Sequence, residues 1–274
     1  MKITLITACR NAKAHIATAM ESVLAQKNVD VEYIVVDGAS TDGTQGVIKD
    51  YEPKFNGRMR WISEPDRGMY DAINKGINMA TGDVVGILNA DDVVASDDTL
   101  ANIAEAFKSG GVRSGGVESG GVGERVDCVY ADIRFVREGA SVEALRAAKT
   151  VRYCSAAKWK PWMFRFAAMV PHPSFYVRRE CFERLGGYSL DYRICADFEL
   201  ELRYLYLAKL KAAYLPECVV VMRMGGASTA GWRSNVEINR EDLRALRSHG
   251  IWSCLPLIYL KYLFKIWGFV FRSR

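Results

Sequence analysis

The alternation of strands and helices in the first hundred residues constrains the fold of this chain more than any other feature. Four short apolar runs, each bounded by polar or turn-forming residues, have the length of strands; they cover residues 3–8, 31–37, 59–63 and 83–88. Between them, apolar side chains recur at helical spacing over residues 16–24 and 69–80. Helices that alternate with strands carry the chain back across a sheet, so consecutive strands run parallel. The sequence therefore predicts an α/β fold with a doubly wound, mostly parallel sheet.

Polar residues follow each of these four strands. They are Arg10-Asn11, the stretch 37–42, the stretch 64–67 and Asp91-Asp92. In open α/β sheets, ligands bind beyond the carboxyl ends of the strands. We therefore expect a binding site at this edge of the sheet.

The fourth strand ends in "GILNADD", which places two adjacent carboxylates directly after a buried run. Removing a charge from water is costly unless a partner offsets it. One interpretation is a polar strand end whose aspartates cap the next helix. The other is a site for a divalent cation, because such cations prefer carboxylate oxygens.

Composition narrows the class of protein. The chain has 274 residues, enough for one large α/β domain, and its formal charge of +5 is too small to indicate a nucleic-acid partner. The seven cysteines are scattered without a C-x-x-C pair, and the first strand begins directly after the N-terminal residues, with no signal peptide. We expect reduced, mostly buried thiols in a cytoplasmic protein and no structural zinc site.

Residues 109–125 contain three copies of "SGGV". This glycine-rich repeat is typical of a flexible surface insertion without chemistry. A phosphate-binding loop is the alternative, but no strand leads into it and no Lys-Ser or Lys-Thr pair follows. Beyond it, the pattern predicts a strand over 126–136, a short helix and a longer one within 171–206, a strand over 214–224 and a polar helix from Ser234 to about Ser248.

The C-terminal stretch 251–271 is apolar and aromatic, yet Pro256 interrupts it and Lys261 lies near its centre. A membrane-spanning helix needs about 20 uninterrupted apolar residues. Lys261 and Lys265 are one helical turn apart, which favours a basic amphipathic helix that lies in a membrane interface with both lysines on one side. Docking on the protein's own core, or a dimer contact, are the alternatives.

Several stretches resemble family 2 glycosyltransferases, which have the GT-A fold. They are "ITACRNAKAHIATAMESVLAQ", "EYIVVDGASTDGT", "SEPDRGMYDAINKGINMATGDVVGILNADD" and "HPSFYVRRECFERLGGY" followed by "DYRICADFELELR". The resemblance covers roughly residues 1–230, in order, and leaves 231–274 as a C-terminal helical extension. Within this family, the chain resembles the bacterial branch that builds surface polysaccharides and other glycans on lipid carriers.

The resemblance implies a metal site in "NADD" that holds Mg²⁺ or Mn²⁺ against the diphosphate of a nucleotide sugar. Asp91 matches the second aspartate of the family's Asp-x-Asp motif, with Asp92 directly after it as a second candidate ligand. Asn89 stands at the first position, usually acidic, where it can bind a ribose hydroxyl but adds no charge. This departure puts the number and strength of the metal contacts in question.

The same resemblance assigns three further residues to the donor. Asp37 matches the aspartate that binds the nucleotide, although an aspartate before Gly38 also suits a turn. Asp66 and Arg67 fall where the family places polar side chains near the base and the diphosphate. Arg67 can pair with phosphate oxygens or form a surface ion pair.

An inverting transfer needs a base that takes the proton from the acceptor hydroxyl. The family's base is an aspartate at the start of the helix after "GGY", which corresponds to Asp197; a helix-capping role is the alternative. Glu199 and Glu201, each two residues further along, are expected to point to other faces of this helix. His172 lies on the acceptor side in the family and is either a contact to phosphate or acceptor, or a structural histidine.

Together these patterns predict an inverting, metal-dependent glycosyltransferase with a nucleotide-sugar donor, UDP by default. The acceptor is expected to be a glycan that is lipid-linked at the inner face of the cytoplasmic membrane. Residues 222–229 resemble the loop that closes over the donor in this family. Two alternatives remain. One is a nucleotidyltransferase, although "TACRNAKA" lacks its glycine-rich, basic signature; the other is a sugar-nucleotide-binding protein without transfer activity.

Overall fold

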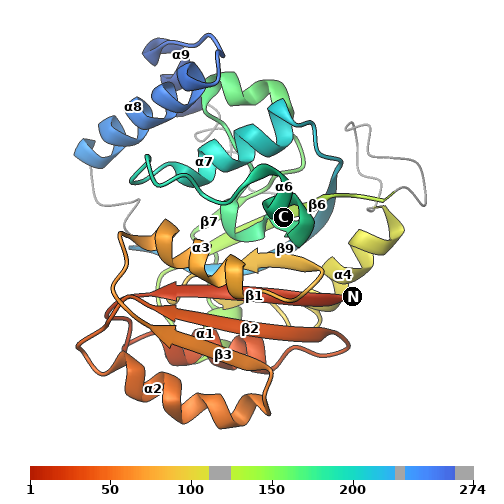
Figure 1. Cartoon of the computed structure of the whole chain (residues 1–274), viewed down its shortest axis with the longest axis vertical. Coiled ribbons are helices and arrows are strands. Elements are labelled where there is room, and N and C mark those ends of the chain that lie inside the picture. The colour runs from red at the N-terminus through yellow and green to blue at the C-terminus, as the bar shows by residue number, and fades with distance from the viewer. Residues whose placement is uncertain (111–124, 226–231, 263–274) are drawn as a thin grey trace.

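A computed structural model of the chain describes residues 1–110, 125–225 and 232–262. Nine strands of this part form one sheet in the order β3-β2-β1-β4-β8-β6-β9-β5, with β7 paired to β6 (Figure 1). The predicted α/β class and mostly parallel sheet are confirmed. Three stretches about which the sequence makes predictions lie outside the described residues. They are most of the glycine-rich insertion (111–124), residues 226–229 of the predicted donor loop, and residues 263–271 of the C-terminal stretch.

The first half of the sheet is wholly parallel. It consists of β1 (Lys2–Cys9), β2 (Asp30–Asp37), β3 (Met59–Ser63) and β4 (Val84–Ile87). Side chains alternate along these strands between two apolar clusters: Ile34 and Val36 of β2 face one side, whereas Tyr33 and Val35 face the other. Both faces of the sheet are therefore covered, which is why these strands read as nearly continuous apolar runs.

The second half of the sheet is mixed. Its strands are β5 (Val93–Val94), β6 (Cys128–Val136), β7 (Arg152–Cys154), β8 (Tyr176–Arg178) and β9 (Ala212–Arg223). β8 runs antiparallel to both β4 and β6, whereas β6 and β9 are parallel. The two-residue strand β5 comes directly after "NADD" and pairs with the end of β9. This pairing brings the two chain segments at residues 91–92 and 223 together.

Helices cover both faces of the sheet. The structure places them at α1 (Ile16–Leu24), α2 (Thr44–Tyr51), α3 (Met69–Met79), α4 (Thr99–Ser109), α5 (Val142–Ala147), α6 (Arg179–Leu185), α7 (Ala196–Glu201), α8 (Trp232–Ser248) and α9 (Leu255–Tyr259). Short 3₁₀ turns lie at η1 (Glu52–Phe55), η2 (Pro161–Phe166) and η3 (His172–Ser174), and a π-helical turn, η4 (Leu202–Leu207), continues α7. One apolar cluster lies under α1 and α4, and the other joins α3, α6, α7 and α8.

The C-terminal segment docks on the protein. Ile258 of α9 is fully buried, and the Lys261 ammonium lies 2.6 Å from a carboxylate oxygen of Asp242 on α8, with both side chains buried. The described part of this segment therefore agrees with the alternative of docking on the protein's own core, where the charge of Lys261 compensates a buried aspartate. Whether Lys261 and Lys265 lie on one side stays a prediction, because Lys265 lies outside the described residues. Within the described chain, no helix has the length and apolar character needed to cross a membrane.

Candidate active site

Asp37 ends β2 at the carboxyl edge of the sheet, in register with Cys9 of β1 and Ser63 of β3. Its carboxylate is completely buried. Ser63 donates a hydrogen bond of 2.6 Å to one oxygen, and the hydroxyl and backbone N–H of Ser40 donate to the two oxygens. The predicted donor aspartate is thus held in one orientation by the hydroxyl groups of Ser40 and Ser63 and by the Ser40 N–H.

The loops after β1 and β2 hold each other in place. The Asn11 backbone N–H donates to the Ser40 hydroxyl at 2.7 Å, and the Asn11 side chain accepts from the Thr41 N–H at 3.0 Å. The Lys13 N–H donates to Asp42, which also accepts from Thr44 at the start of α2. Asp42 therefore serves as a turn and helix-start residue. Hydrogen bonds to its charged form, first of all from the Thr44 side chain, lower its pKa.

Asp66 and Arg67 lie on the next loop, after β3. Asp66 accepts the Gly68 N–H at 2.9 Å, and its other oxygen approaches Gly38 so closely that a Cβ at Gly38 would lie 2.2 Å from it. A side chain at residue 38 would have to displace the Asp66 carboxylate, so Gly38 leaves room for that carboxylate beside the Asp37 loop. Arg67 is largely exposed, and its guanidinium lies 3.7 Å from Asp71, a surface pairing that leaves it accessible to a ligand.

The "NADD" segment forms a turn with two very different aspartates. Asp92 is buried: the Asn89 amide donates to one oxygen at 2.8 Å and the Arg223 backbone N–H to the other at 3.1 Å. Burial, followed by the nearby Asp91 carboxylate, raises the pKa of Asp92 to about 8. Asp92 thus belongs to the interior of the turn.

Asp91 is only half-buried. Its carboxylate makes no hydrogen bond or ion pair with any residue of the described chain, although its charge acts on Asp92 and Arg223. The Asp91 carboxylate lies beside Asp92, whose negative form is already disfavoured. A cation bound at Asp91 would relieve the repulsion between these two carboxylates. Among the described residues, however, no three His, Cys, Asp or Glu side chains gather into a group that could hold a metal by themselves.

Arg223 fixes this turn from the end of β9, although no sequence motif assigns a role to this residue by itself. Its guanidinium donates to the backbone carbonyl of Asp91, to the Thr18 hydroxyl at 3.1 Å and to the Gly139 carbonyl at 3.2 Å. Burial lowers its pKa, and the two aspartates oppose that effect. The only sequence signal was its place at the start of the predicted donor loop.

Asp197 lies in the first turn of α7, on the other side of α3 from the donor loops. One carboxylate oxygen accepts the Phe198 N–H at 2.8 Å and the Tyr70 hydroxyl at 3.1 Å. No group of the described chain donates to the other oxygen. The hydroxyl of Tyr70 has one proton, which it shares between Asp197 and the closer Ile194 carbonyl, so this tyrosine of α3 fastens the chain just before α7.

Glu199 and Glu201, the two competitors of Asp197, are engaged elsewhere. Glu199 forms a two-point ion pair with Arg203, both contacts at 3.0 Å, and accepts from His249 at 2.8 Å. Glu201 is fully buried and accepts the Val170 N–H. The expectation that Glu201 points away from Asp197 is wrong, because Glu201 is four residues after Asp197 and the two share one helix face. Burial has the larger effect in raising the pKa of Glu201, and the Asp197 charge adds to it.

His172 belongs to a buried cluster next to Asp197. Its Nε2 lies 2.7 Å from the Tyr188 hydroxyl, and the Tyr188 ring stacks on Tyr70 with centroids 5.5 Å apart. Burial lowers the pKa of His172, and Asp197 opposes this. Asn74 of α3 makes two 2.8 Å hydrogen bonds to the backbone of Tyr188, so α3 holds both the "GGY" turn and α7.

The structure thus gathers the predicted residues into two groups. Asp37, Asp66, Arg67, Asn89 and Asp91 lie at or after strand ends at the carboxyl edge of the parallel half-sheet. Asp197 and His172 lie beside the first turn of α3, where Asp197 contacts Tyr70 and His172 contacts Tyr188, whose ring stacks on Tyr70. Tyr70 and Arg223 are the residues that the sequence did not single out. Tyr70 was visible only as a member of the stretch "EPDRGMYDAINKG".

Comparisons with known proteins identify similar sequences and similar folds. Residues 4–123 match the family model described as Glycosyl transferase family 2. A PGL/p-HBAD biosynthesis glycosyltransferase of Mycobacterium tuberculosis is 27% identical over 245 residues, which are 89% of this chain and 83% of that protein. An uncharacterized glycosyltransferase of the same species is 32% identical over 203 residues, 73% of this chain and 68% of that protein.

Two solved structures share the fold. TarS of S. aureus, residues 1–349 in complex with UDP-GlcNAc, superposes with a TM-score of 0.63 at 15% identity, covering 90% of this chain and 66% of that chain. The mannosyltransferase PcManGT of Pyrobaculum calidifontis, in complex with GDP-Man and Mn²⁺, gives 0.59 at 22% identity, covering 88% and 64%. The chain therefore spans slightly less than two thirds of the length of these solved chains. From the sequence matches and this fold, the chain belongs to glycosyl transferase family 2 and has the GT-A fold.

Proposed function

We propose that this chain is an inverting, metal-dependent glycosyltransferase that moves a sugar from a nucleotide-sugar donor to a glycan acceptor. The observation that carries the proposal is the placement of Asp197. Its carboxylate is fixed through one oxygen by Tyr70 and the Phe198 N–H, and the other oxygen is left without a donor. A carboxylate fixed in this way can accept a proton with little reorganisation.

In the proposed reaction, the free oxygen of Asp197 takes the proton of an acceptor hydroxyl. The hydroxyl oxygen then bonds to the anomeric carbon of the donor sugar as the bond from that carbon to the diphosphate breaks. The electron pair leaves with the nucleoside diphosphate, and the single displacement inverts the anomeric configuration. His172 and Tyr188 lie beside Asp197 and would orient the acceptor on this side.

The donor would lie across the carboxyl edge of the parallel strands. Asp37 and Asp66 would contact the base and ribose, and Asn89 a ribose hydroxyl. Arg67 would approach the phosphates. UDP is the proposed nucleotide; TarS, which shares this fold, has been solved with UDP-GlcNAc.

A divalent cation, Mg²⁺ or Mn²⁺, would neutralise the charge that develops on the leaving diphosphate. Asp91 fits this role because its carboxylate is accessible and has no hydrogen-bond partner in the described chain. Asp92, the second candidate ligand, is bound by Asn89 and the Arg223 N–H. In our proposal Asp92 therefore supports the turn that presents Asp91.

The acceptor is proposed to be lipid-linked, in biosynthesis of a bacterial polysaccharide of the O-antigen type, with the enzyme peripheral on the inner face of the cytoplasmic membrane. The mycobacterial relatives named for PGL/p-HBAD biosynthesis support a role in glycan assembly. No nucleic-acid partner is proposed.

Asp197→Asn tests the role of the base. The substitution keeps the side chain's size and the hydrogen bond from the Phe198 N–H but removes the proton acceptor. Turnover should fall by about 10³-fold or more, whereas donor binding, measured by calorimetry, should change little. Asp191→Asn, at an exposed loop aspartate six residues earlier, is the matched control and should retain activity. Transfer by Asp197→Asn at a near-normal rate would refute the assignment.

The donor and the metal can be tested without an acceptor. Thermal unfolding with a panel of nucleotide sugars, each with and without Mn²⁺, should show a rise in Tm for one donor that depends on the metal. If no nucleotide sugar raises Tm under either condition, the catalytic proposal fails. The anomeric configuration of the product, read by NMR, decides between inversion and retention.

A further inference from the structure

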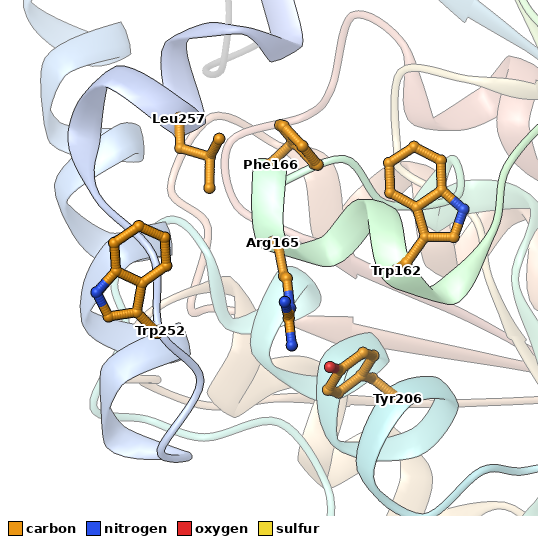
Figure 2. Close-up of a pocket in the computed structure, with 6 residues that line it drawn as sticks. All are labelled: Trp162, Arg165, Phe166, Tyr206, Trp252 and Leu257. Atoms are coloured by element: carbon orange, nitrogen blue, oxygen red, sulfur yellow. The ribbon is translucent and has the colours of Figure 1, made fainter.

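A surface pocket of about 500 Å³ lies between η2, η4 and the C-terminal segment, apart from the candidate active site. Figure 2 shows Trp252 and Leu257 of the C-terminal segment on one side of it and side chains of η2 on the other. The remaining lining residues are Trp162, Arg165, Phe166 and Tyr206. Aromatic rings and one guanidinium therefore surround an opening that no step of the proposed reaction uses.

The rim of this pocket is unusually apolar for an exposed surface. The Trp252 side chain is 75% exposed and Trp162 is 54% exposed. We use the name aromatic rim for the exposed apolar residues of these three segments, which are Trp162, Leu207, Trp252, Leu255, Tyr259 and Leu260. Large exposed apolar side chains that gather in one region mark a contact surface, whereas scattered ones do not.

The docking of α9 explains why these side chains point outward. Ile258 is buried, and Lys261 turns inward to Asp242. Leu255 and Tyr259 are one helical turn apart and are exposed. The helix therefore buries Ile258 and the charge of Lys261 and leaves other apolar side chains exposed.

Exposed basic side chains lie on the stretches that supply the pocket and the rim. The stretches 155–170, 202–211 and 251–262 contain seven basic residues and no acidic one, and of these Arg203 pairs with Glu199 and Lys261 with Asp242. In the whole chain, by contrast, 37 basic residues are nearly balanced by 32 acidic ones. Lys158, Arg165 and Lys209 are exposed, so the surface beside the rim is positively charged.

We infer that the aromatic rim and its basic surround dock the enzyme on a lipid bilayer that carries anionic headgroups. This rests on the membrane location in the proposed function and names the surface responsible for it. Trp and Tyr are favoured at the level of the headgroups, where an apolar ring and a polar edge are both accommodated. Lys and Arg beside them are attracted to anionic lipids, whose charge complements theirs.

A second copy of the chain suits this surface poorly. A two-fold dimer through the rim would bring the same patch of both copies together. Lys158, Arg165 and Lys209 of one copy would then face the same cations of the other, with no acidic residue in these stretches to compensate them. A bilayer with anionic headgroups supplies the missing negative charge.

Flotation with vesicles tests the inference on the full chain. The protein should float with vesicles of phosphatidylcholine mixed with phosphatidylglycerol and float poorly with phosphatidylcholine alone. Trp162→Ser with Trp252→Ser should reduce the bound fraction by about tenfold, as should Lys158→Glu with Arg165→Glu. Because all four side chains are at least partly exposed on the surface, both variants should keep the wild-type Tm.

The matched control reverses two charges at the opposite end of the molecule. Lys49 and Lys54 are exposed on α2 and η1, and α2 and α9 lie at opposite ends of the longest axis (Figure 1). Lys49→Glu with Lys54→Glu has the same change in net charge and should float like the wild type. Equal loss in this control would show that net charge alone matters and would overturn the inference.

A chain that ends at Tyr262 separates the rim from the residues after it. It should still float, at a reduced level at most, if the rim is the docking surface. If flotation is abolished by this truncation but not by the two tryptophan substitutions, or if the full chain never floats, the inference is wrong. A concentration-dependent dimer that the tryptophan substitutions dissociate would also overturn it. Donor-induced Tm shifts, measured in parallel without vesicles, report on the proposed function independently.

Discussion

Tyr70 links α3, the helix that follows the Asp66 loop, to the chain at Asp197. Its hydroxyl proton is shared between Asp197 and the carbonyl of Ile194. Burial and then the Asp197 charge raise the pKa of this tyrosine, so it remains a hydrogen-bond donor at any working pH. A stable donor at this position fixes the orientation of the carboxylate and stabilises its charged form.

Tyr70→Phe should therefore slow the reaction without weakening donor binding. Loss of this hydrogen bond leaves the Asp197 carboxylate less firmly oriented for accepting the proton, so kcat should fall by about tenfold while the donor Kd, measured by calorimetry, stays the same. Tyr188→Phe, which removes the partner of His172 but keeps the contact between Tyr70 and Asp197, is the comparison and should lower kcat less. A kcat of Tyr70→Phe equal to that of the wild type would mean that Tyr70 only supports the fold.

Glu32 shows how the same principles act on stability, far from the reaction. It is buried on β2, which raises its pKa, but hydrogen bonds from Thr4, Thr81 and Arg60 outweigh burial and bring the pKa down to about 2. A carboxyl whose pKa is lowered on folding contributes stability above its unfolded pKa and loses it as pH falls toward the folded value. The contribution of Glu32 should thus be complete near neutral pH and disappear between about pH 4.5 and 2.

Glu32→Gln should destabilise the protein at pH 7 by roughly 2 kcal/mol, and the difference from wild type should shrink at pH 3. Urea denaturation at both pH values measures this. Glu105→Gln, on an exposed glutamate, should have little effect at either pH. A constant difference at both values would rule out the charge of Glu32 as the cause.

At the scale of elements, local patterns predicted the parallel half of the sheet well. Strand β3 has the predicted bounds, and β1, β2 and β4 differ by one residue at their ends. β1, β2 and β3 are each followed by a helix, as the alternation in the sequence predicts, so local sequence and fold agree there. The two-residue strand β5 and the antiparallel position of β8 between β4 and β6 were not predictable, because both depend on pairings with distant strands.

The candidate site divides in the same way. Asp37, Asp91 and Asp197 were found from motifs, since each stands at the end or start of an element. The different environments of Asp91 and Asp92 were not predictable from two adjacent identical residues. They arise because β9 returns to this turn more than one hundred residues later and brings Arg223 with it.

Arg223→Met should loosen the turn that presents Asp91. It leaves the carbonyls of Asp91 and Gly139 without their donor, and each unsatisfied buried group costs about 1–3 kcal/mol. We expect a lower midpoint in urea and a smaller Tm shift with donor and Mn²⁺. Arg184→Met, at an exposed arginine of α6, is the control. If Arg223→Met is destabilised but shows the wild-type Tm shift with donor and Mn²⁺, the turn held by Arg223 is not needed for metal binding.

At the scale of the whole molecule, the fold has a parallel half at one end and the α7, α8 and α9 layer at the other, with α3 between them (Figure 1). Sequence patterns predicted the C-terminal stretch as a basic amphipathic surface helix. They could not show that Lys261 is used internally, because the need for it arises from Asp242 on another helix. The result changes which side of α9 is exposed, and so moves the proposed membrane contact from its lysines to its apolar side chains.

The Asp242–Lys261 pair attaches α9 to the rest of the protein, so its removal should affect this layer as a unit. In Lys261→Met the Asp242 carboxylate loses its counter-charge, and breaking a buried pair costs about 3–5 kcal/mol. Burial raises the pKa of Asp242 and Lys261 opposes that rise, so without the lysine the protonated form gains further. Because the folded state then binds a proton that the unfolded state does not, the stability of Lys261→Met should fall as pH rises from 5 to 8. The double variant Asp242→Asn with Lys261→Met has no buried charge at this pair to titrate. In urea denaturation it should recover most of the lost stability and show a flat pH dependence. Equal instability of the single and double variants would show that packing, not charge, holds α9 in place.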